Sequence, residues 1–233
     1  MNPKVLVCVL HCDRKYHNRM IPLESIALLD YLNYEVYYNI ETKEKDNWKD
    51  LIAASYPRLP KLYYDFWNYE SNWWKKPEYD QDQARLVPIV RGRNDAIECA
   101  IDVGAEYILF VDSDMVIPQN TIKKLMSHNK PMVGGFVKGR NGHKHVSYVF
   151  GDIEEIGNDL ILCDSANTGF VLIKREVFGV LKFRRGWHRV TGLNQPDDPN
   201  YCSDAFLMGF GRLLVDKSVE AKHLDETILE WRD

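Results

Sequence analysis

The sequence lacks a long hydrophobic segment, an excess of positive charge and a regular cysteine framework. Its first apolar run, Val5–Leu10, is too short to span a membrane, and no signal-peptide cleavage pattern accompanies it. The 30 basic and 34 acidic residues give a net charge of −4, which disfavours a general nucleic-acid coat or a binder of anionic membranes. Five cysteines, an odd number without regular spacing, indicate free thiols in a reducing, cytoplasmic protein.

Two phosphate-binding fingerprints are also missing. Gly209 and Gly211 lack the third glycine of a dinucleotide-binding motif, because position 214 is Leu. Gly134 and Gly139 have the spacing of a P-loop, but the Lys and the Ser or Thr that must follow are absent. No repeat, low-complexity tract or linker interrupts the 233 residues, which fit one domain.

The hydrophobic patterns that are present predict an α/β fold. Val5–Leu10 is continuously apolar, as in a buried parallel strand. Pro22 opens a helical pattern that runs to Leu32, with Leu32 on the inward face, and residues 35–40 alternate as a second strand. This β-α-β start predicts a single domain over residues 1–233, with a mostly parallel central sheet flanked by helices.

The remaining segments continue this alternation of helices and strands. We expect residues 41–55 to be partly helical, a helix from Asn94 or Asp95 to Gly104, and Pro88 to break or start a helix. Residues 184–201 contain Gly, Pro, Asn and Asp throughout and are expected to form a loop. Further strands are expected at 107–111, 131–137, 145–150, 160–163, 170–173 and 213–215, with helices following Pro118 and at 176–181.

Residues 56–79 hold nine aromatic side chains and are expected to form an aromatic-rich insertion. Trp and Tyr suit the C–H faces of sugar rings, so Trp67, Trp73 and Trp74 are candidates for contacting a sugar acceptor. Packing within the insertion or contact between subunits explains the same residues equally well. Trp187 is a further acceptor candidate, in a loop that either closes over substrate or remains an ordinary surface loop.

Asp112 and Asp114 are the central chemical feature. They form an Asp-x-Asp pair directly after the apolar strand 107–111. Ligands of open parallel sheets bind at the carboxyl ends of the strands. Two carboxylates there can hold a hard divalent cation such as Mg²⁺ or Mn²⁺, which prefers oxygen ligands and bridges substrate phosphates. A solvated acidic turn is the alternative.

Four segments around this pair occur in an order that is more specific than any one of them. Arg93-Asn94 precedes Glu106–Asp114, and Asn167–Phe178, Ser203-Asp204, and Val215–Val219 with His223 follow. Together they resemble GT-A glycosyltransferases, and in particular the large family two of inverting, nucleotide-sugar-dependent enzymes. The resemblance covers residues 3–15 and 84–225, and the aromatic segment has no counterpart in it.

The resemblance implies a GT-A domain that moves a sugar from a nucleotide-diphosphate sugar to an acceptor, with inversion and with Mn²⁺ or Mg²⁺ as cofactor. It implies that Asp112, Asp114 and His223 form the metal site. The bridging oxygen of the departing diphosphate accumulates charge, which such a metal neutralises. The nucleotide-sugar contacts that it implies are His11, Asp13, Arg91, Arg93, Asn94, Asp112, Ser113, Asn167 and Gly169.

The catalytic base of an inverting transfer lies across the sugar from the leaving diphosphate, so it is not a metal ligand. By resemblance the base is Asp204, although Ser203 stands where the family usually has Glu. Asp197 and Asp198 are the reserve candidates.

Several of these residues also have ordinary explanations. Arg91 and Arg93 can pair with phosphate in bidentate fashion or form a solvated basic face. Asn94 can cap a helix. His11 and Asp13 follow the first strand, where base and ribose are expected, but ordinary loop residues also occur there.

Two other functions fit parts of the sequence. A haloacid-dehalogenase-type phosphohydrolase would use Asp112 as its nucleophile, but it usually carries that motif near the N-terminus. A non-catalytic carbohydrate-binding protein would use the aromatic residues without needing the acidic motifs. We expect a nucleotide-sugar donor, an unidentified glycan, lipid or protein acceptor, no nucleic-acid partner and no transmembrane segment. A lipid-linked acceptor would place this otherwise cytoplasmic protein at a membrane surface.

Overall fold

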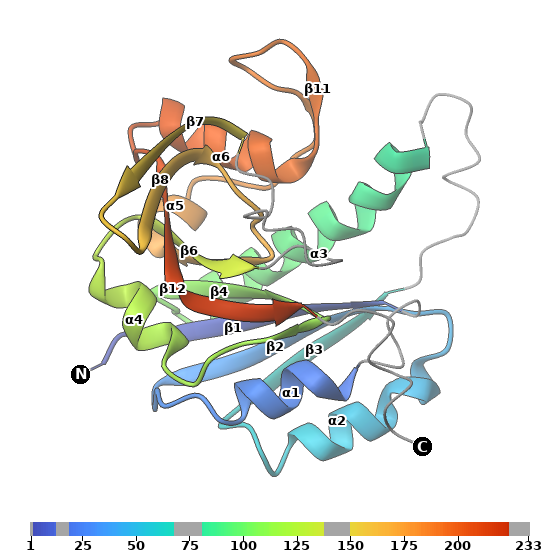
Figure 1. The fold of residues 1–233 in the computed structure, drawn as a ribbon. Helices are drawn as coiled ribbons and strands as arrows, with labels where there is room; N and C mark the ends of the chain where they lie inside the picture. Colours follow the sequence, from blue (N-terminus) through green and yellow to red (C-terminus); the bar gives the residue numbers. More distant parts are fainter. Residues whose placement is uncertain (1, 13–18, 68–80, 138–149, 224–233) are drawn as a thin grey trace.

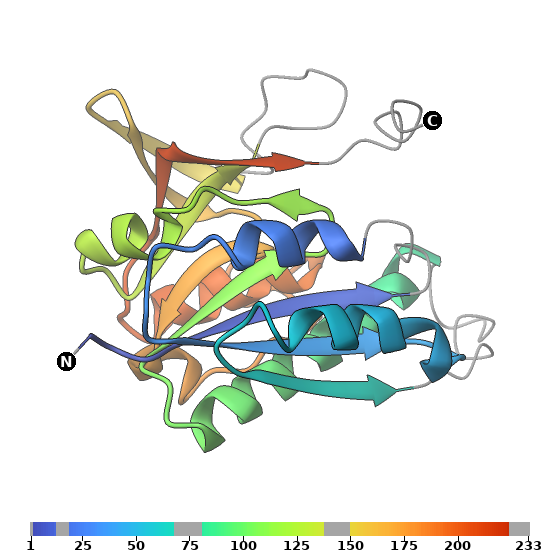
Figure 2. The same ribbon diagram turned by 90° about the horizontal axis from the view of Figure 1, so that it is seen from below.

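The structure is a computed structural model that describes residues 2–12, 19–67, 81–137 and 150–223, with the backbone alone for residues 81–86 and 150–152. A ten-stranded sheet runs through the domain, and helices cover both of its faces (Figures 1 and 2). The predicted α/β class is confirmed. Asp13, Trp73, Trp74 and the predicted strand residues 145–149 lie outside the described residues.

One half of the sheet is parallel and the other is mixed. Strands β3, β2, β1 and β4 lie side by side and parallel, and their bounds are Leu62–Trp67, Tyr34–Glu41, Val5–Cys12 and Tyr107–Asp112. The next strand, β9 (Phe170–Lys174), is antiparallel to both neighbours, β4 and β6. Beyond it the order is β6 (Met132–Val137), β12 (Leu213–His223), β8 (Leu160–Ser165) and β7 (Phe150–Ile156).

Strand β1 shows why the sheet is covered on both faces. Its side chains alternate, so Val5, Val7 and Val9 pack into one hydrophobic core while Leu6 and Cys8 pack into the other. A strand that is apolar on both faces is stable only between two layers of helices.

The helices divide between these two cores. The first core receives α1 (Met20–Ile26), α2 (Lys49–Ser55) and α4 (Thr121–Ser127), whereas the second receives α3 (Gln81–Asp102), α5 (Arg175–Phe178) and α6 (Asp197–Leu207). A 3₁₀ turn, η2 (Lys45–Trp48), precedes α2. Within the described ranges, no helix is both long and apolar enough to cross a membrane.

Three expected helix boundaries are wrong. Helix α1 ends at Ile26, and Leu32 is 89% exposed rather than inward-facing. Helix α3 begins at Gln81 and continues through Pro88, because its later turns are held by burial of Ala96, Ile97 and Ala100. Helix α6 begins inside the expected loop, where acidic residues in its first turn complement the positive end of the helix dipole.

The aromatic segment is partly an element of the main sheet. Residues 62–67 form β3, which pairs with β2 at the edge of the sheet, from Leu62 opposite Val36 to Trp67 opposite Glu41. This part of the segment is therefore an edge strand. Residues 68–79 lie outside the described residues.

Strand β12 carries the chain from the middle of the sheet back to the Asp-x-Asp turn. Its pairing with β6 is interrupted between Asp216 and Glu220. The Asp216 carboxylate holds this irregularity: it accepts a hydrogen bond from the Ser218 amide at 2.8 Å and lies 2.8 Å from His128 Nε2. After it, His223 pairs with Met115 of the short strand β5 (Met115–Val116), directly after Asp114.

Candidate active site

The candidate active site forms where β4 ends beside the start of β9. The Asp112 amide donates a 2.8 Å hydrogen bond to the Gly169 carbonyl. The side-chain oxygen of Asn167 accepts a 2.6 Å hydrogen bond from the Gly169 amide, which fixes the turn before β9. Asp112, Asn167 and Gly169, three of the predicted site residues, thus come together from segments more than 50 residues apart.

Position 169 must be glycine because it lies against the Asp112 side chain. A Cβ atom at Gly169 would overlap the Asp112 carboxylate, whose Oδ2, Cγ and Oδ1 atoms are its nearest neighbours. The small residue therefore leaves space for the acid.

The second acidic residue, Asp114, lies beside the predicted histidine. Asp114 Oδ1 is 3.6 Å from His223 Nε2, and both side chains are largely buried. The pairing of β5 with the end of β12 positions them. The structure thus brings these two residues together, and their role as metal ligands stays a prediction.

Asp112, at the end of β4, has a pKa well above that of an ordinary aspartate. Burial raises the pKa of Asp112 to about 7, and the negative charges of Asp114, Asp198 and Asp197 add to this effect, while Arg93 opposes it. Several carboxylates thus lie near one strand end, and the positive charge of Arg93 does not fully offset their negative charge. Such a site favours an added cation.

The residue types present fit a divalent metal. An imidazole nitrogen and carboxylate oxygens are ligands that Mn²⁺ accepts, and Asp114 and His223 supply one of each at close range. Among the described residues, no group of three or more His, Cys, Asp or Glu side chains could hold a metal by itself. A metal held here would thus take its other ligands from water or substrate oxygens.

Arg93 holds the neighbouring helix to this site. Its buried guanidinium lies over the Phe183 ring, and its Nη1 donates to Asp197 Oδ2 at 2.5 Å, Asp198 Oδ1 at 2.6 Å and the Thr168 hydroxyl at 2.5 Å. The interpretation of Arg93 as part of a solvated basic face is therefore wrong. Its contact with a donor diphosphate stays a prediction, and the structure gives this group two carboxylate partners that the sequence did not indicate.

The two carboxylates on Arg93 differ in exposure. Asp197 is fully buried, and burial raises its pKa to about 6 against the opposing charge of Arg93. The Asp198 side chain remains 28% exposed and accepts hydrogen bonds from the Thr168 hydroxyl and, at 3.2 Å, from the Thr168 amide. Thr168 precedes Gly169, so Asp198 is tied to the same turn that contacts Asp112.

Asp204 lies about two turns further along α6 in a different environment. Its carboxylate forms a bidentate pair with Arg184, with distances of 2.6 Å and 2.8 Å, and Arg189 Nε lies 3.2 Å from Oδ1. The role of Asp204 as the base therefore stays a prediction, for a carboxylate whose two oxygens are both engaged by arginines.

Other predicted contact residues have structural partners. Arg91 is exposed, lies 4.9 Å above the Trp67 ring and sits 3.7 Å from Asp95. Trp67 Nε1 donates to Asn39 at 2.7 Å, so the indole is tied to the sheet. Asn94 lies mid-helix and exchanges two hydrogen bonds with the Phe183 backbone, so the helix-cap interpretation is wrong.

The last predicted residues are divided between interior and surface. His11 is buried, with its ring 5.1 Å from the Tyr38 ring and 5.3 Å from the Trp48 ring, and neither ring nitrogen has a hydrogen-bond partner among the described residues. Ser113 is buried within the Asp-x-Asp turn. Trp187 is 73% exposed on a separate two-stranded ribbon.

Sequence reasoning overlooked Thr168 and placed Asp197 and Asp198 in a loop. A usable signal was present, since Pro196 followed by two acids is typical of a helix start. The pairing of Arg184 with Asp204 had no such signal.

Comparisons with known proteins identify the fold. The family model described as glycosyltransferase family 25, N-terminal domain, matches residues 2–146, more than half of the chain. A comparison with curated proteins finds no significant match.

Solved structures agree with this match. TarS from S. aureus superposes with a TM-score of 0.61 at 17% identity, over 95% of this chain and 37% of TarS. The mannosyltransferase PcManGT from Pyrobaculum calidifontis was solved in complex with GDP-Man and Mn²⁺. It superposes with a TM-score of 0.60 at 14% identity, over 100% of this chain and 60% of its own length. A197 from STIV superposes with a TM-score of 0.51 at 15% identity, over 96% of this chain and 86% of A197. The fold is thus that of GT-A glycosyltransferases, and the chain spans less than two thirds of TarS and of the mannosyltransferase.

Proposed function

Since the chain belongs to the glycosyltransferases that carry the family 25 N-terminal domain, we propose that it transfers a sugar from a nucleotide-diphosphate sugar to an acceptor hydroxyl, with a divalent metal. The observation that carries this proposal is the convergence of Asp112, Asp114 and His223 at the carboxyl end of a parallel strand. The family match favours this reaction over a phosphohydrolase or a non-catalytic carbohydrate-binding protein. The specific likeness to family two, and with it inversion, remains a prediction.

The structural neighbours support a nucleotide-sugar donor. Residues 1–349 of TarS have been solved with UDP and with UDP-GlcNAc, and the mannosyltransferase with GDP-Man and Mn²⁺. We propose Asp114 and His223 as metal ligands, with Asp112 directed to the metal or to the ribose. A bound metal would neutralise the charge that develops on the departing diphosphate.

We propose Asp198 in place of Asp204 as the group that accepts the proton of the acceptor hydroxyl. Asp198 is partly exposed, and its carboxylate accepts hydrogen bonds from Thr168, in the turn that contacts Asp112, so it can be reached from the site, as a base must be. In contrast, Asp204 has both oxygens engaged by arginines, so a hydroxyl would have to displace one of them. Arg93 is a positioning residue in this proposal, since its guanidinium donates to Asp198 at 2.6 Å and orients that carboxylate.

The proposal is tested by thermal unfolding with UDP or GDP in the presence of Mn²⁺ or of EDTA. A ligand of the folded state raises the melting temperature by mass action, so at least one nucleotide should do so with Mn²⁺ and much less with EDTA. Asp114→Asn should abolish the difference, whereas Asp30→Asn, which changes a distant exposed acid, should preserve it. Equal stabilisation with Mn²⁺ and with EDTA would contradict the metal site. Failure of every nucleotide to stabilise the protein would contradict the donor site.

A further inference from the structure

A β-ribbon projects from the molecule on the side of α6. Strands β10 (Gly186–Trp187) and β11 (Asn194–Gln195) pair antiparallel, and the ribbon extends beyond the helices that cover the sheet (Figure 1). Its tip has a defined shape, because the His188 amide donates to the Leu193 carbonyl at 2.8 Å and the Gly192 amide to the His188 carbonyl at 2.9 Å. We call residues 184–195 the ribbon.

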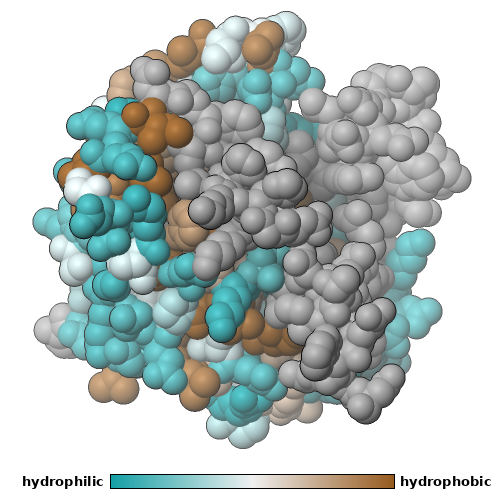
Figure 3. Space-filling model, in the orientation of Figure 1, coloured by the Kyte–Doolittle hydropathy of each residue, from teal (hydrophilic) through white to brown (hydrophobic). Residues whose placement is uncertain are grey.

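The ribbon exposes large apolar side chains. Trp187, Val190 and Leu193 are 73%, 64% and 59% exposed. Figure 3 shows hydrophobic residues at the outer edge of the molecule where the ribbon lies in Figure 1. Three such side chains within seven residues, on a projecting turn, are typical of a contact surface rather than of scattered surface residues.

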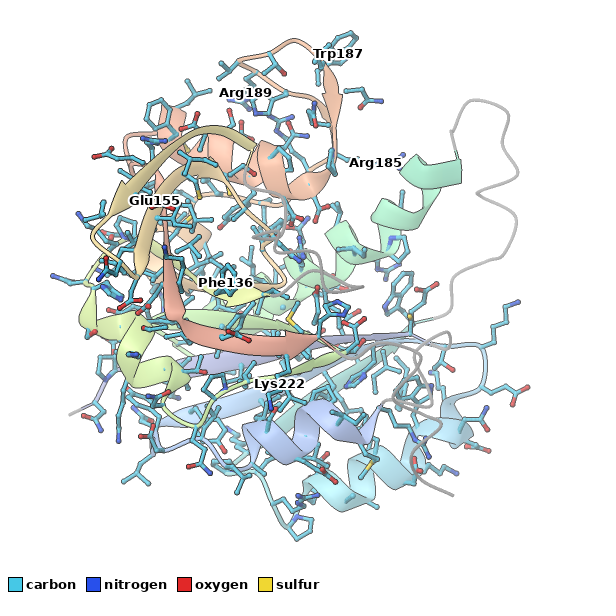
Figure 4. The ribbon with its side chains drawn as sticks, in the orientation of Figure 1. Phe136, Glu155, Arg185, Trp187, Arg189 and Lys222 are labelled. Atoms are coloured by element: carbon cyan, nitrogen blue, oxygen red, sulfur yellow. The ribbon has the colours of Figure 1, made fainter. Side chains whose placement is uncertain are left out.

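The ribbon is also basic. Residues 182–193 contain Lys182, Arg184, Arg185 and Arg189 and no Asp or Glu. Two acids offset part of this charge: Asp204 of α6 pairs with Arg184 and Arg189, and Glu98 of α3 lies 3.3 Å from Lys182. Figure 4 shows Arg185 and Arg189 on the same ribbon as Trp187.

The net charge of the whole chain does not cancel this local charge. At physiological salt, charges separated by more than about 10 Å are largely screened, so a surface responds to the nearby residues of the ribbon. The expectation that a chain of charge −4 avoids anionic membranes therefore does not apply to this surface.

We propose that the ribbon binds the surface of an anionic lipid membrane. Tryptophan and aliphatic side chains at a projecting tip fit the headgroup level of a bilayer, and arginines pair with lipid phosphates. An acidic polypeptide would satisfy the arginines but offers no apolar layer for three exposed side chains. The proposal uses no metal or donor residue and does not rest on the proposed function.

Co-sedimentation of the full chain with lipid vesicles tests this proposal. We expect binding to phosphatidylcholine vesicles that contain about one third phosphatidylglycerol, and little binding to pure phosphatidylcholine. The variant Arg185→Gln/Arg189→Gln should bind more weakly, by about fivefold per arginine. The variant Trp187→Ser/Val190→Ser/Leu193→Ser should lose binding even at low salt.

The controls are Leu32→Ser, which alters a still more exposed apolar residue, and Lys130→Gln, which alters an exposed cation outside the ribbon. Both variants should bind like the unaltered chain. The melting temperature of each variant checks that it is folded. Binding that is insensitive to the ribbon variants, or no binding to anionic vesicles, would overturn the proposal. So would binding to poly-glutamate that needs the arginines but not the apolar residues, which would indicate an acidic protein partner.

Discussion

The amide of Asp112 and the carbonyl of Gly169 are joined by a 2.8 Å hydrogen bond, and the Asp112 carboxylate fills the space that a side chain at position 169 would need. One residue thus sets the position of another across two antiparallel strands. We expect Gly169→Ala to destabilise the protein by about 1–3 kcal/mol, the usual cost of overpacking. It should also abolish the Mn²⁺-dependent rise in melting temperature with nucleotide.

Gly134→Ala is the matched control for this variant. A Cβ at Gly134 would meet its nearest neighbour, Val215, at an ordinary 3.5 Å. If Gly169→Ala binds nucleotide with Mn²⁺ as well as Gly134→Ala does, nucleotide binding does not depend on the present position of the Asp112 carboxylate.

The ion pairs of Arg93 predict a large effect on stability. Arg93→Met leaves the buried Asp197 and the neighbouring Asp198 without their cation, and breaking a buried pair from one side costs about 3–5 kcal/mol. Urea unfolding should report this loss. Adding Asp197→Asn to Arg93→Met should recover part of it, since one uncompensated charge is removed.

The exposed pair of Lys123 with Asp30 provides the comparison. Lys123→Met should change the free energy of unfolding by no more than about 1 kcal/mol. A similar small change in Arg93→Met would mean that the buried pairs are replaceable.

The choice between two candidate bases can be settled by their amide variants. We expect Asp198→Asn to bind nucleotide with Mn²⁺ but to lose sugar transfer by about two to four orders of magnitude, the usual contribution of a general base. Release of nucleotide diphosphate in the presence of acceptor measures this. Asp204→Asn should retain transfer, because arginines already engage both oxygens of its carboxylate. The reverse result would return the role to Asp204.

His11 predicts a dependence of stability on pH. Burial lowers its pKa to about 3, below its ordinary value of 6.5, so the unfolded chain binds the proton first as the pH falls. The stability is therefore complete above pH 6.5 and is lost progressively toward pH 3. Between about pH 7 and pH 5 this one residue should cost about 2 kcal/mol.

His11→Leu should remove that part of the pH dependence, while His188→Gln on the ribbon should leave it unchanged. The measurement is the urea midpoint at each pH. Parallel curves for the unaltered chain and His11→Leu would show that His11 can become charged in the folded protein.

The sequence predicts those parts of the fold that depend on local pattern. Strands β1, β4 and β9 are short, mostly apolar runs, and burial on both faces leaves such runs little alternative, whereas β2 was predicted from its alternating pattern. The position of Asp112 at a strand end follows from the same pattern. The antiparallel insertion of β9 between β4 and β6 has no such signature, because strand order depends on contacts distant in sequence.

The candidate site divides in the same way. Asp114 and His223 were paired by resemblance to a family, and the structure brings them within 3.6 Å. Arg93 and Asp197 are separated by 104 positions, and no periodicity links them. Asp204 matched a motif in order, but the arginines that engage it lie 15 and 20 residues away in a segment expected to be loop.

The interruption in β12, the last strand along the chain, determines which face of the sheet each later side chain of that strand occupies. Four steps along β12 from Asp216 to Glu220 correspond to one step along β6, so the strand leaves its partner and rejoins it. Side chains alternate after that point, and Lys222, labelled in Figure 4, therefore occupies the face opposite to His223. Gain of one residue among positions 217–219 would move Lys222 into the place of His223, and would present an ammonium group to Asp114 in place of an imidazole. An insertion in this interruption can in this way convert the proposed pair of metal ligands into an ion pair without altering either acid.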